Sequence, residues 1–371
     1  VTMKAVHVAP LHRRGDVRVL LKECVSLAES GVDVSCIVGD GEGDDLFNGV
    51  KIVDSGRPPV EKFSKYLVPL FRSAQMARRS KADIIHFHDG VFLPFAIFLA
   101  LIGHRVIYDV HEDYPRQILN SRFPMLVNRA ASLLYTVLEW VGGRVFTAIV
   151  AATPHIAKRF PEKKTLAVQN FPLLNELIAA GGPPYGERDS TFAYVGGITA
   201  ARGAREMVRA VEELKDRQVV LELVGSFSPL SLQTATETLP GWRQVRFHDW
   251  LAREQVASVL GSCRAGLVLY HPVPNHLEAQ PNKLFEYMAA GLPVIASDFP
   301  LWRRIVEGAG CGLLVDPLDP KAIADAMNWI LDHPDEAAAM GERGRKAVIE
   351  SYNWEKEAEK LVALYRSLES R

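Results

Sequence analysis

The sequence predicts an α/β protein built from two doubly wound domains in tandem. The first observation is its length, because 371 residues are more than twice the roughly 150 of a typical domain. The second is that short β-branched runs alternate with stretches of helical periodicity in both halves. The third is residues 179–190, where glycine, proline and polar residues interrupt the periodicity, as is typical of a linker.

The first half, residues 1–178, is predicted to form one domain. Its strands are expected at residues 5–9, 32–38, 83–88, 105–110 and 148–153, with helices at 17–30, 91–102 and 126–141. These strands lack polar alternation, which is typical of a parallel sheet covered by helices on both faces.

The second half, residues 191–352, repeats the pattern and is predicted to be the second domain. Its strands are expected at residues 191–195, 219–224, 244–247, 266–270, 294–297 and 312–315. Residues 353–371 are predicted to form a C-terminal helix that crosses back to the first domain.

Composition excludes several classes of protein. Apolar residues make up 48% and charged residues 23%, with 43 basic against 44 acidic side chains, so disorder and generic nucleic-acid binding are not expected. The four cysteines are far apart and form no C-x-x-C pair, which argues against a zinc knuckle or a disulfide framework. The longest apolar run, 91–103, is too short to span a bilayer. We expect a cytoplasmic protein without a secretory signal.

The most informative motif contains two glutamates, Glu278 and Glu286, separated by seven residues. Pro281, Asn282 and Lys283 open a short helix whose free N–H groups and dipole favour a diphosphate, and Lys283 adds a positive charge. Glu286, about one turn along, can accept hydrogen bonds from ribose hydroxyls, and Glu278 can reach sugar hydroxyls. The alternative is a capped helix with solvated glutamates.

This motif resembles the E-x7-E signature of retaining glycosyltransferases of family 4. The resemblance implies the GT-B fold, in which two Rossmann-like domains face a central cleft. It also implies a nucleotide-diphosphate sugar as donor, bound by the C-terminal domain through Asn282, Lys283 and Glu286. Glu278 and Lys283 are then also expected at the catalytic centre.

A second motif follows the predicted strand 191–195. Gly196 and Gly197 precede Arg202 at a helix start, and a glycine turn between a strand and a helix is a phosphate cradle by geometry. Family members usually carry an arginine directly after the first glycine, where this chain has Gly197. The resemblance therefore implies that Arg202 and Lys283 together neutralise the leaving diphosphate. The alternative for Arg202 is a surface position.

The first domain offers histidine candidates at its strand ends. His111 follows strand 105–110 and resembles the family's strand-end histidine near the donor sugar, with Asp113 close by; a structural role is the alternative. His86 and His88 point to one face of a strand, which superficially suggests a metal site. No third ligand has convincing spacing, so we expect no metal and no cofactor, and assign His86 and His88 to the wall of the cleft.

The loop after the first strand is basic rather than glycine-rich. Gly15 is the remaining member of the glycine pair that relatives place over the donor phosphates. Arg13 or Arg14 can approach a phosphate or an anionic acceptor, although an ordinary surface loop explains the same residues.

We therefore predict retaining transfer of a sugar to a polysaccharide, lipid-linked or other acceptor in cell-envelope glycan synthesis. The alternatives are a nucleotide-sugar epimerase of the same fold and a non-catalytic sugar-nucleotide-binding subunit. Residues 1–175 carry a net charge of +5 and residues 176–371 a net charge of −6. Basic segments at 57–79 and 116–129 favour peripheral contact with an anionic membrane at its cytoplasmic face. Two ordinary helices packed on the sheet are the alternative.

Overall fold

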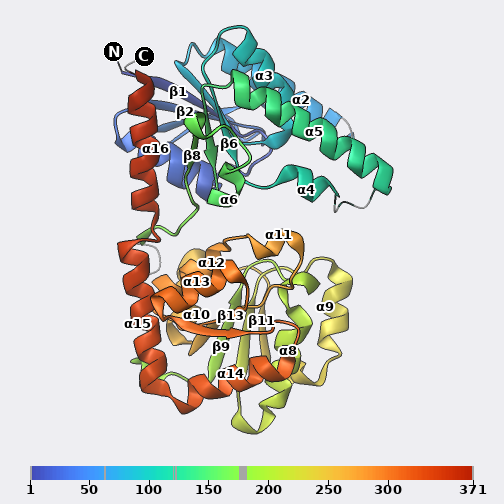
Figure 1. Cartoon of the computed structure of the whole chain (residues 1–371), viewed down its shortest axis with the longest axis vertical. Coiled ribbons are helices and arrows are strands. Elements are labelled where there is room, and N and C mark those ends of the chain that lie inside the picture. The colour runs from blue at the N-terminus through green and yellow to red at the C-terminus, as the bar shows by residue number, and fades with distance from the viewer. Residues whose placement is uncertain (1, 62–63, 120, 122, 175–181, 370–371) are drawn as a thin grey trace. The chain divides into compact units, whose positions relative to one another are not determined.

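The computed structural model describes residues 2–61, 64–119, 121, 123–174 and 182–369 (Figure 1). The chain divides into two compact units, one formed by residues 1–170 with 354–371 and the other by residues 171–353. The division therefore falls before the predicted boundary at residue 178. The predicted linker lies partly outside the described residues, and its remainder contains the short turn η4, Tyr185–Glu187.

The first unit contains a sheet with the strand order β3-β4-β2-β1-β5-β6-β7-β8. All neighbouring strands are parallel except β3 and β4, which are antiparallel. The strands are β1 Lys4–Val8, β2 Asp33–Val38, β3 Asp45–Phe47, β4 Val50–Asp54, β5 Ile84–Phe87, β6 Val106–Val110, β7 Ala148–Ala151 and β8 Thr165–Ala167.

Helices cover this sheet on both faces. They are η1 Val17–Cys24, α1 Val25–Glu29, α2 Ser64–Arg79, η2 Gly90–Phe92, α3 Leu93–Leu101, α4 Tyr114–Leu119, α5 Met125–Val145, α6 Pro154–Ala157, η3 Glu162–Lys164 and α16 Trp354–Glu369. On one face, apolar side chains of β1, β5 and β6 form a core with α2, α3 and α5. On the other face, η1 and α1 pack against α16, so the C-terminal helix belongs to the first unit.

The second unit contains a wholly parallel sheet with the strand order β11-β10-β9-β12-β13-β14. The strands are β9 Thr191–Val195, β10 Val220–Val224, β11 Val245–His248, β12 Ala265–Val268, β13 Val294–Ser297 and β14 Gly312–Val315. The order reverses between β9 and β12, and doubly wound sheets bind ligands outside the carboxyl ends of the strands at such a switch point.

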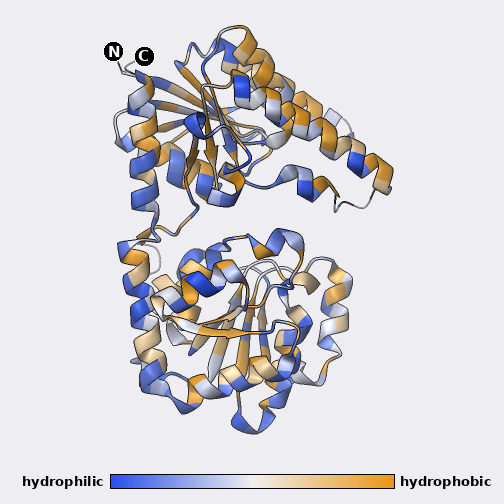
Figure 2. Cartoon of the chain, viewed as in Figure 1, coloured by the Kyte–Doolittle hydropathy of each residue, from blue (hydrophilic) through white to orange (hydrophobic). Residues whose placement is uncertain are grey.

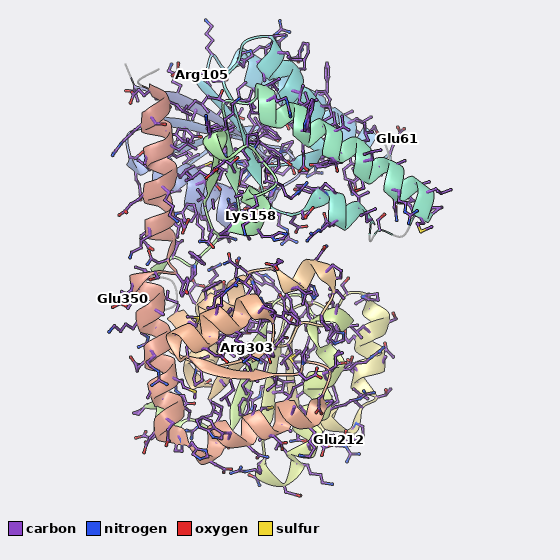
Figure 3. All side chains as sticks on the ribbon, in the orientation of Figure 1. Glu61, Arg105, Lys158, Glu212, Arg303 and Glu350 are labelled. Carbon is purple, nitrogen blue, oxygen red and sulfur yellow. The ribbon has the colours of Figure 1, made fainter. Side chains whose placement is uncertain are left out.

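Helices also flank the second sheet, and their side chains fill both of its faces (Figure 3). They are η5 Ala200–Arg202, α8 Ala204–Glu213, η6 Lys215–Arg217, α9 Leu230–Glu237, η7 Pro240–Gln244, α10 Arg253–Ser262, α11 Pro274–Leu277, α12 Asn282–Ala289, α13 Pro300–Ala309, α14 Pro320–Asp332 and α15 Pro334–Glu350. The predicted fold class, two doubly wound α/β domains, is confirmed.

Two local differences from the predicted elements have physical reasons. Residues 17–24 form a π-helix rather than the first turns of an α-helix, starting at Asp16, whose carboxylate accepts from the backbone N–H groups of Arg18 and Val19. Strands β3, β4 and β8 are additional to the predicted ones; β3 and β8 have only three residues each, and β3 is exposed along its whole length. None of the described helices is long and apolar enough to cross a membrane.

Candidate active site

In the second unit, glycines bring the loops after β9 and β10 into close contact. Gly196 has φ of 120°, a region that L side chains rarely adopt. A Cβ atom on Gly225 would lie 2.2 Å from the carbonyl oxygen of Gly196. At the start of α8, Gly203 has φ of 75°, and a Cβ there would lie 2.5 Å from the Leu269 carbonyl oxygen. These positions require glycine, and they lie beside the switch point of the sheet.

Lys283, in the first turn of α12, places a buried cation at this edge. Its side chain is 6% exposed, and its Nζ atom lies 3.5 Å from the centre of the Tyr194 ring. Within the described structure this Nζ has no hydrogen-bond partner. Burial lowers the pKa of Lys283 well below its usual range and the charge of Arg202 lowers it further, whereas Glu286 acts in the opposite direction. A buried ammonium group without a partner indicates that an anion completes this site.

Arg202 lies beside the position where family members usually carry an arginine. It donates a hydrogen bond from Nη1 to the carbonyl oxygen of Gly197 at 3.2 Å. A Cβ on residue 197 would lie 3.0 Å from that nitrogen, so glycine at this position leaves room for the Arg202 guanidinium. Lys283 and Arg202 also share a neighbouring ring, that of Tyr270, at 5.6 and 5.4 Å. The structure therefore brings together Gly196, Gly197, Arg202 and Lys283, as predicted.

The two glutamates of the motif are placed by α11 and α12. Asn282 begins α12, and Glu286 follows one turn later with its side chain 26% exposed and an oxygen 4.0 Å from an Arg253 nitrogen. Glu278 ends α11, on the loop that precedes α12. Both glutamates thus belong to the segment that holds Lys283, which is the geometry expected of donor-binding acids.

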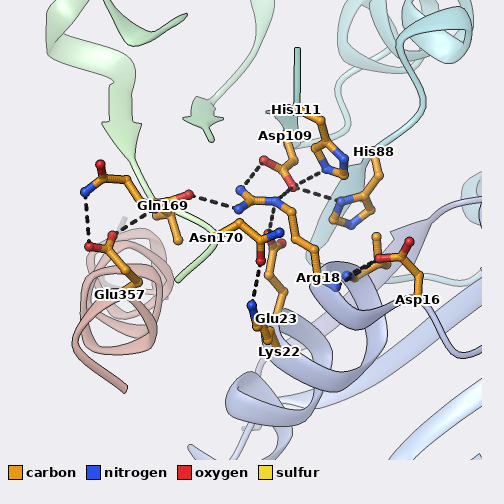
Figure 4. A network of polar contacts seen from close by, with 12 residues as sticks. Asp16, Arg18, Lys22, Glu23, His88, Asp109, His111, Gln169, Asn170 and Glu357 are labelled. Atoms are coloured by element: carbon orange, nitrogen blue, oxygen red, sulfur yellow. Dashed lines mark hydrogen bonds and ion pairs between the residues drawn. The ribbon is translucent and has the colours of Figure 1, made fainter. Parts of the chain in front are cut away.

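In the first unit, His111 is held by a buried carboxylate. Its Nε2 atom lies 2.6 Å from Oδ2 of Asp109, and its side chain is 16% exposed while that of Asp109 is fully buried. His88 approaches the same oxygen with Nδ1 at 3.1 Å. The carboxylate therefore fixes the orientation of a histidine that remains partly accessible (Figure 4).

The π-helix η1 supplies the cation that stabilises this carboxylate. Arg18 donates from Nε and Nη2 to the two oxygens of Asp109 at 3.0 and 2.8 Å. It also donates to the carbonyl oxygen of Val168. Burial alone would raise the pKa of Asp109, but the charges of Arg18 and His111 hold it well below its usual range. Asp109 is thus a buried anion that stays ionised at neutral pH.

The prediction that His86 and His88 shape the wall of the cleft is wrong, because both side chains are fully buried. His86 lies on strand β5 and His88 directly follows it, on the face covered by η1 and α16. His7 of β1 is paired with His86. The hydroxyl oxygen of Tyr365, on α16, lies 3.2 Å from Nε2 of His7 and 2.9 Å from Nδ1 of His86. His7 and His88 are hydrogen-bonded to one another at 2.9 Å.

The fold also places further potential metal ligands beside His86 and His88, which the spacing of residues along the sequence did not indicate. His7 and Glu23 bring potential ligand atoms within 4.8 Å of those of His86 and His88, and His88, Asp109 and His111 form a similar group. However, both ring nitrogens of His7 and His88, and Nδ1 of His86, already engage protein partners. Among the described residues, Nε2 of His86 and both carboxylate oxygens of Glu23 have no hydrogen-bond partner, although Oε1 of Glu23 lies 3.1 Å from Nε of Arg18. The absence of a metal therefore stays a prediction.

The remaining predicted residues lie apart from this network. Arg13 and Gly15 are exposed, and a Cβ on Gly15 would meet nothing within 4 Å, so the loop does not require glycine there. Arg14 is paired with Asp40 at 2.8 Å. Asp113 is paired with Arg159 at 3.1 Å and so has a structural partner.

Sequence reasoning missed several residues that complete the two sites. Arg18 and Asp109 were not recognised, although a charged residue inside the apolar strand 105–110 is a signal for a buried partner. Tyr194 and Tyr270, which border the Lys283 ammonium, carry no sequence signal, because an aromatic residue at a strand end is usually a core residue.

Two doubly wound α/β units in one chain are the architecture of the GT-B fold. Residues 14–166 match the model of Glycosyltransferase Family 4, and residues 183–347 match that of Glycosyl transferases group 1. A D-inositol 3-phosphate glycosyltransferase of Corynebacterium urealyticum is 31% identical over 99% of this chain and 95% of that protein. The chain belongs to glycosyltransferase family 4 and is a transferase.

Other similarities are consistent with this membership. A D-inositol 3-phosphate glycosyltransferase of Corynebacterium jeikeium is also 31% identical, over 49% of this chain, and the match spans less than half (44%) of that relative's own length. The crystal structure of a sucrose-phosphate synthase from Thermosynechococcus elongatus superposes with a TM-score of 0.76 at 19% identity, covering 99% of each chain. At this identity the superposition shows the fold alone.

Proposed function

We propose that the protein is a retaining glycosyltransferase that uses a nucleotide-diphosphate sugar as donor. The observation that carries the proposal is the buried Lys283 ammonium, which has no hydrogen-bond partner and lies beside Arg202 at the glycine turn after β9. Two cations and the N-terminus of α12 converge where a diphosphate would meet them. A free sugar without phosphate would leave these charges unmatched.

The proposed chemistry follows from where charge develops. The bond between the anomeric carbon of the donor sugar and the diphosphate oxygen breaks, and the acceptor hydroxyl attacks from the same face. Its proton passes to the departing oxygen, so no protein base is needed. Arg202, Lys283 and the α12 N-terminus stabilise the negative charge that grows on the diphosphate.

Other residues take binding and orienting roles. Glu286 binds the ribose hydroxyls and Glu278 the sugar hydroxyls. His111, held by Asp109, contacts the transferred sugar or the acceptor from the first unit. Two carboxylates arranged as nucleophile and acid, as in glycosidases, are not part of this proposal.

The acceptor is proposed to be a glycan or lipid-linked saccharide of the cell envelope. Both relatives are named D-inositol 3-phosphate glycosyltransferases, so a small phosphorylated acceptor is the main competing acceptor for this chain. The net charge of +5 on residues 1–175 suits an anionic acceptor of either kind, and it favours peripheral association with an anionic membrane.

Two measurements test the function. Thermal-shift screening against UDP-, GDP-, ADP- and dTDP-sugars identifies the donor, because a ligand that binds the folded state raises the midpoint. Product analysis by NMR then gives the anomeric configuration, and a product with the donor's configuration is expected. Inversion would refute the retaining mechanism. Donor epimerised without acceptor would indicate the epimerase alternative, and nucleotide binding without turnover on any acceptor would indicate a silent subunit.

The proposal includes no essential metal. Because the proposed phosphate partners are cations and amides, a chelator is expected to leave activity within about twofold. Abolition by chelation that one specific metal restores would contradict this and would direct attention to His7, Glu23, His86 and His88.

A further inference from the structure

The long helix α5 has its apolar side facing outward. Positions 126, 130, 133, 137, 140 and 144 follow the spacing of one helix face, and all are exposed. Leu126 is 75% exposed, Leu133 66% and Trp140 58%. A surface helix normally has charged and polar residues on its outward side, so this exposed apolar stripe is unusual.

On the inward side of α5, half-buried Leu138 and Val141 pack against the core, and the buried polar groups of this side have partners. Asn128 donates to the carbonyl oxygens of residues 121 and 123 at 3.0 and 3.1 Å. Ser132 donates to that of Pro115 at 3.0 Å, and Glu139 pairs with Arg159. Rotating the helix to bury the leucines would break these contacts. The outward apolar stripe is therefore a stable feature of the fold.

Two neighbouring helices extend the stripe into a surface. Helix α3 packs against both α5 and α2, and Figure 2 shows hydrophobic residues along α5 and α3. We call the exposed apolar residues of these three helices the apolar helical face. Its members are Tyr66, Leu67, Phe71, Phe98, Leu101, Met125, Leu126, Val127, Leu133, Leu134, Val137 and Trp140. Several large apolar side chains exposed on neighbouring helices are typical of an interaction site.

The charges on the apolar helical face have one sign. Helices α2 and α3 contain no acidic residue, and the single acid of α5, Glu139, is buried. Arg129 and Arg144 are exposed on α5 and Lys65 on α2, and the Arg144 guanidinium lies 3.3 Å from the centre of the Trp140 ring.

This combination favours an anionic bilayer over a second copy of the chain. Leucine and tryptophan on one face with flanking arginines are typical of helices that lie in the membrane interface. A symmetric contact of this face with itself would place like charges together without carboxylates to match them. The bilayer offers both an apolar interior and anionic headgroups.

We propose that the apolar helical face docks on an anionic lipid bilayer, with α5 lying in the interface plane. The proposal deepens the proposed function, since it explains how a transferase reaches a lipid-linked acceptor. It also moves the expected membrane contact from the basic segments 57–79 and 116–129 to a surface whose centre is α5. Lipid partitioning can be measured without turnover, so the two proposals fail independently.

The test is flotation of the full chain with vesicles of phosphatidylglycerol and phosphatidylcholine in a 3:7 ratio, at low and high salt. The test variant replaces Leu126, Leu133 and Trp140 with glutamate. The matched control replaces three exposed apolar residues of the second unit, Leu230, Leu318 and Ile349, with glutamate. Retention of the nucleotide-induced thermal shift by both variants shows that they are folded.

We expect the wild-type chain and the control to float with the vesicles and to retain part of this binding at high salt. The α5 variant should lose at least about 100-fold in partitioning, because each inserted large apolar side chain contributes about tenfold. In vesicles with brominated acyl chains, Trp140 should be quenched, and a Trp140→Phe variant should lose that quenching.

Three outcomes would overturn the proposal. The first is that the wild-type chain does not float with vesicles even at low salt, and the second is that the α5 variant and the control float equally. The third is that the wild type sediments as a dimer, the α5 variant sediments as a monomer, and neither protein binds vesicles. The last would assign the face to a second copy. If a Leu126→Gln, Leu133→Gln variant that folds normally floats as the wild type does, the inference also fails.

Discussion

Replacing Lys283 with methionine should stabilise the empty protein and weaken its binding to a nucleoside diphosphate. The ammonium is buried and has no hydrogen-bond partner, and leaving such a group unmatched costs about 1–3 kcal/mol or more. The cation–π interaction with the Tyr194 ring offsets about 1 kcal/mol of that destabilisation. We therefore expect the unfolding free energy to rise by about 1–2 kcal/mol, which corresponds to about 2–8 °C in the midpoint of the second unit.

Binding of the nucleoside diphosphate should make the wild type more stable than the Lys283→Met variant. Losing one partner of a buried charged contact costs about 3 kcal/mol of binding, or about 150-fold in affinity. At a ligand concentration of 100 times the wild-type Kd, the wild type gains about 2.7 kcal/mol. The variant gains about 0.3 kcal/mol under the same conditions. The loaded wild type should therefore melt above the loaded variant.

The pH dependence of this difference has a definite sign. Burial lowers the pKa of Lys283 in the folded protein below the ordinary value of 10.5, so the folded state binds fewer protons than the unfolded state. Raising the pH towards 10.5 consequently stabilises the wild type relative to the unfolded chain. The advantage of the methionine variant should shrink over that range.

Differential scanning fluorimetry of the full chain, with the nucleoside diphosphate that gives the largest shift, measures all three effects. Lys346→Met is the control, because that side chain is 73% exposed in the same unit and its replacement should change stability by less than about 0.5 kcal/mol. A Lys283→Met protein that is less stable when empty and retains the full ligand-induced shift would refute the diphosphate assignment.

Three further predictions concern the other polar groups. Glu286→Ala should raise the KM for donor about tenfold or more while kcat changes little in steady-state kinetics, since ribose contacts act in the ground and transition states alike; a collapse of kcat alone would contradict this. Asp109→Asn should lower kcat about 10- to 100-fold, because it removes the anion that orients His111, and an unchanged nucleotide-induced thermal shift would separate this loss from misfolding. Burial lowers the pKa of His88 to about 4, although its hydrogen bond to Asp109 acts in the opposite direction. The folded state therefore binds fewer protons than the unfolded state, and the free energy of unfolding should fall as the pH drops from about 6.5 to 4. In urea titrations near pH 5, His88→Asn should reduce the slope of unfolding free energy against pH by about 1 kcal/mol per unit, and an unchanged slope would contradict this.

The architecture could be predicted because it depends on local periodicity. The order of strands and helices along the chain is visible in short apolar runs, and most predicted strands lie within one or two residues of the observed ones. The grouping of the glycine turn with Arg202 and Lys283 could be predicted for a similar reason. Gly196, Gly197 and Arg202 are adjacent along the chain, and Lys283 follows the second strand beside the switch point.

The histidine network could not be predicted, because it depends on register and on distant elements. His7 meets His86 through the pairing of β1 and β5, and Tyr365 comes from the far end of the chain. From the sequence alone, His86 and His88 were expected at the end of a strand, in the wall of the cleft. Coverage of their face by η1 and α16 turns them into buried neutral groups, and no local pattern indicates which face of a strand is covered.

The same limit explains why the outward face of α5 was missed. Helical periodicity identifies an apolar stripe, but it does not say whether that stripe faces the core. In α5, the side that faces the core is set by Asn128, Ser132 and Glu139. Their partners are carbonyl groups and Arg159 on neighbouring segments. Burying a polar group is favourable only when its hydrogen bonds are satisfied. These contacts hold the polar groups of α5 inward, and the leucines and Trp140 on the opposite side are exposed in the described structure.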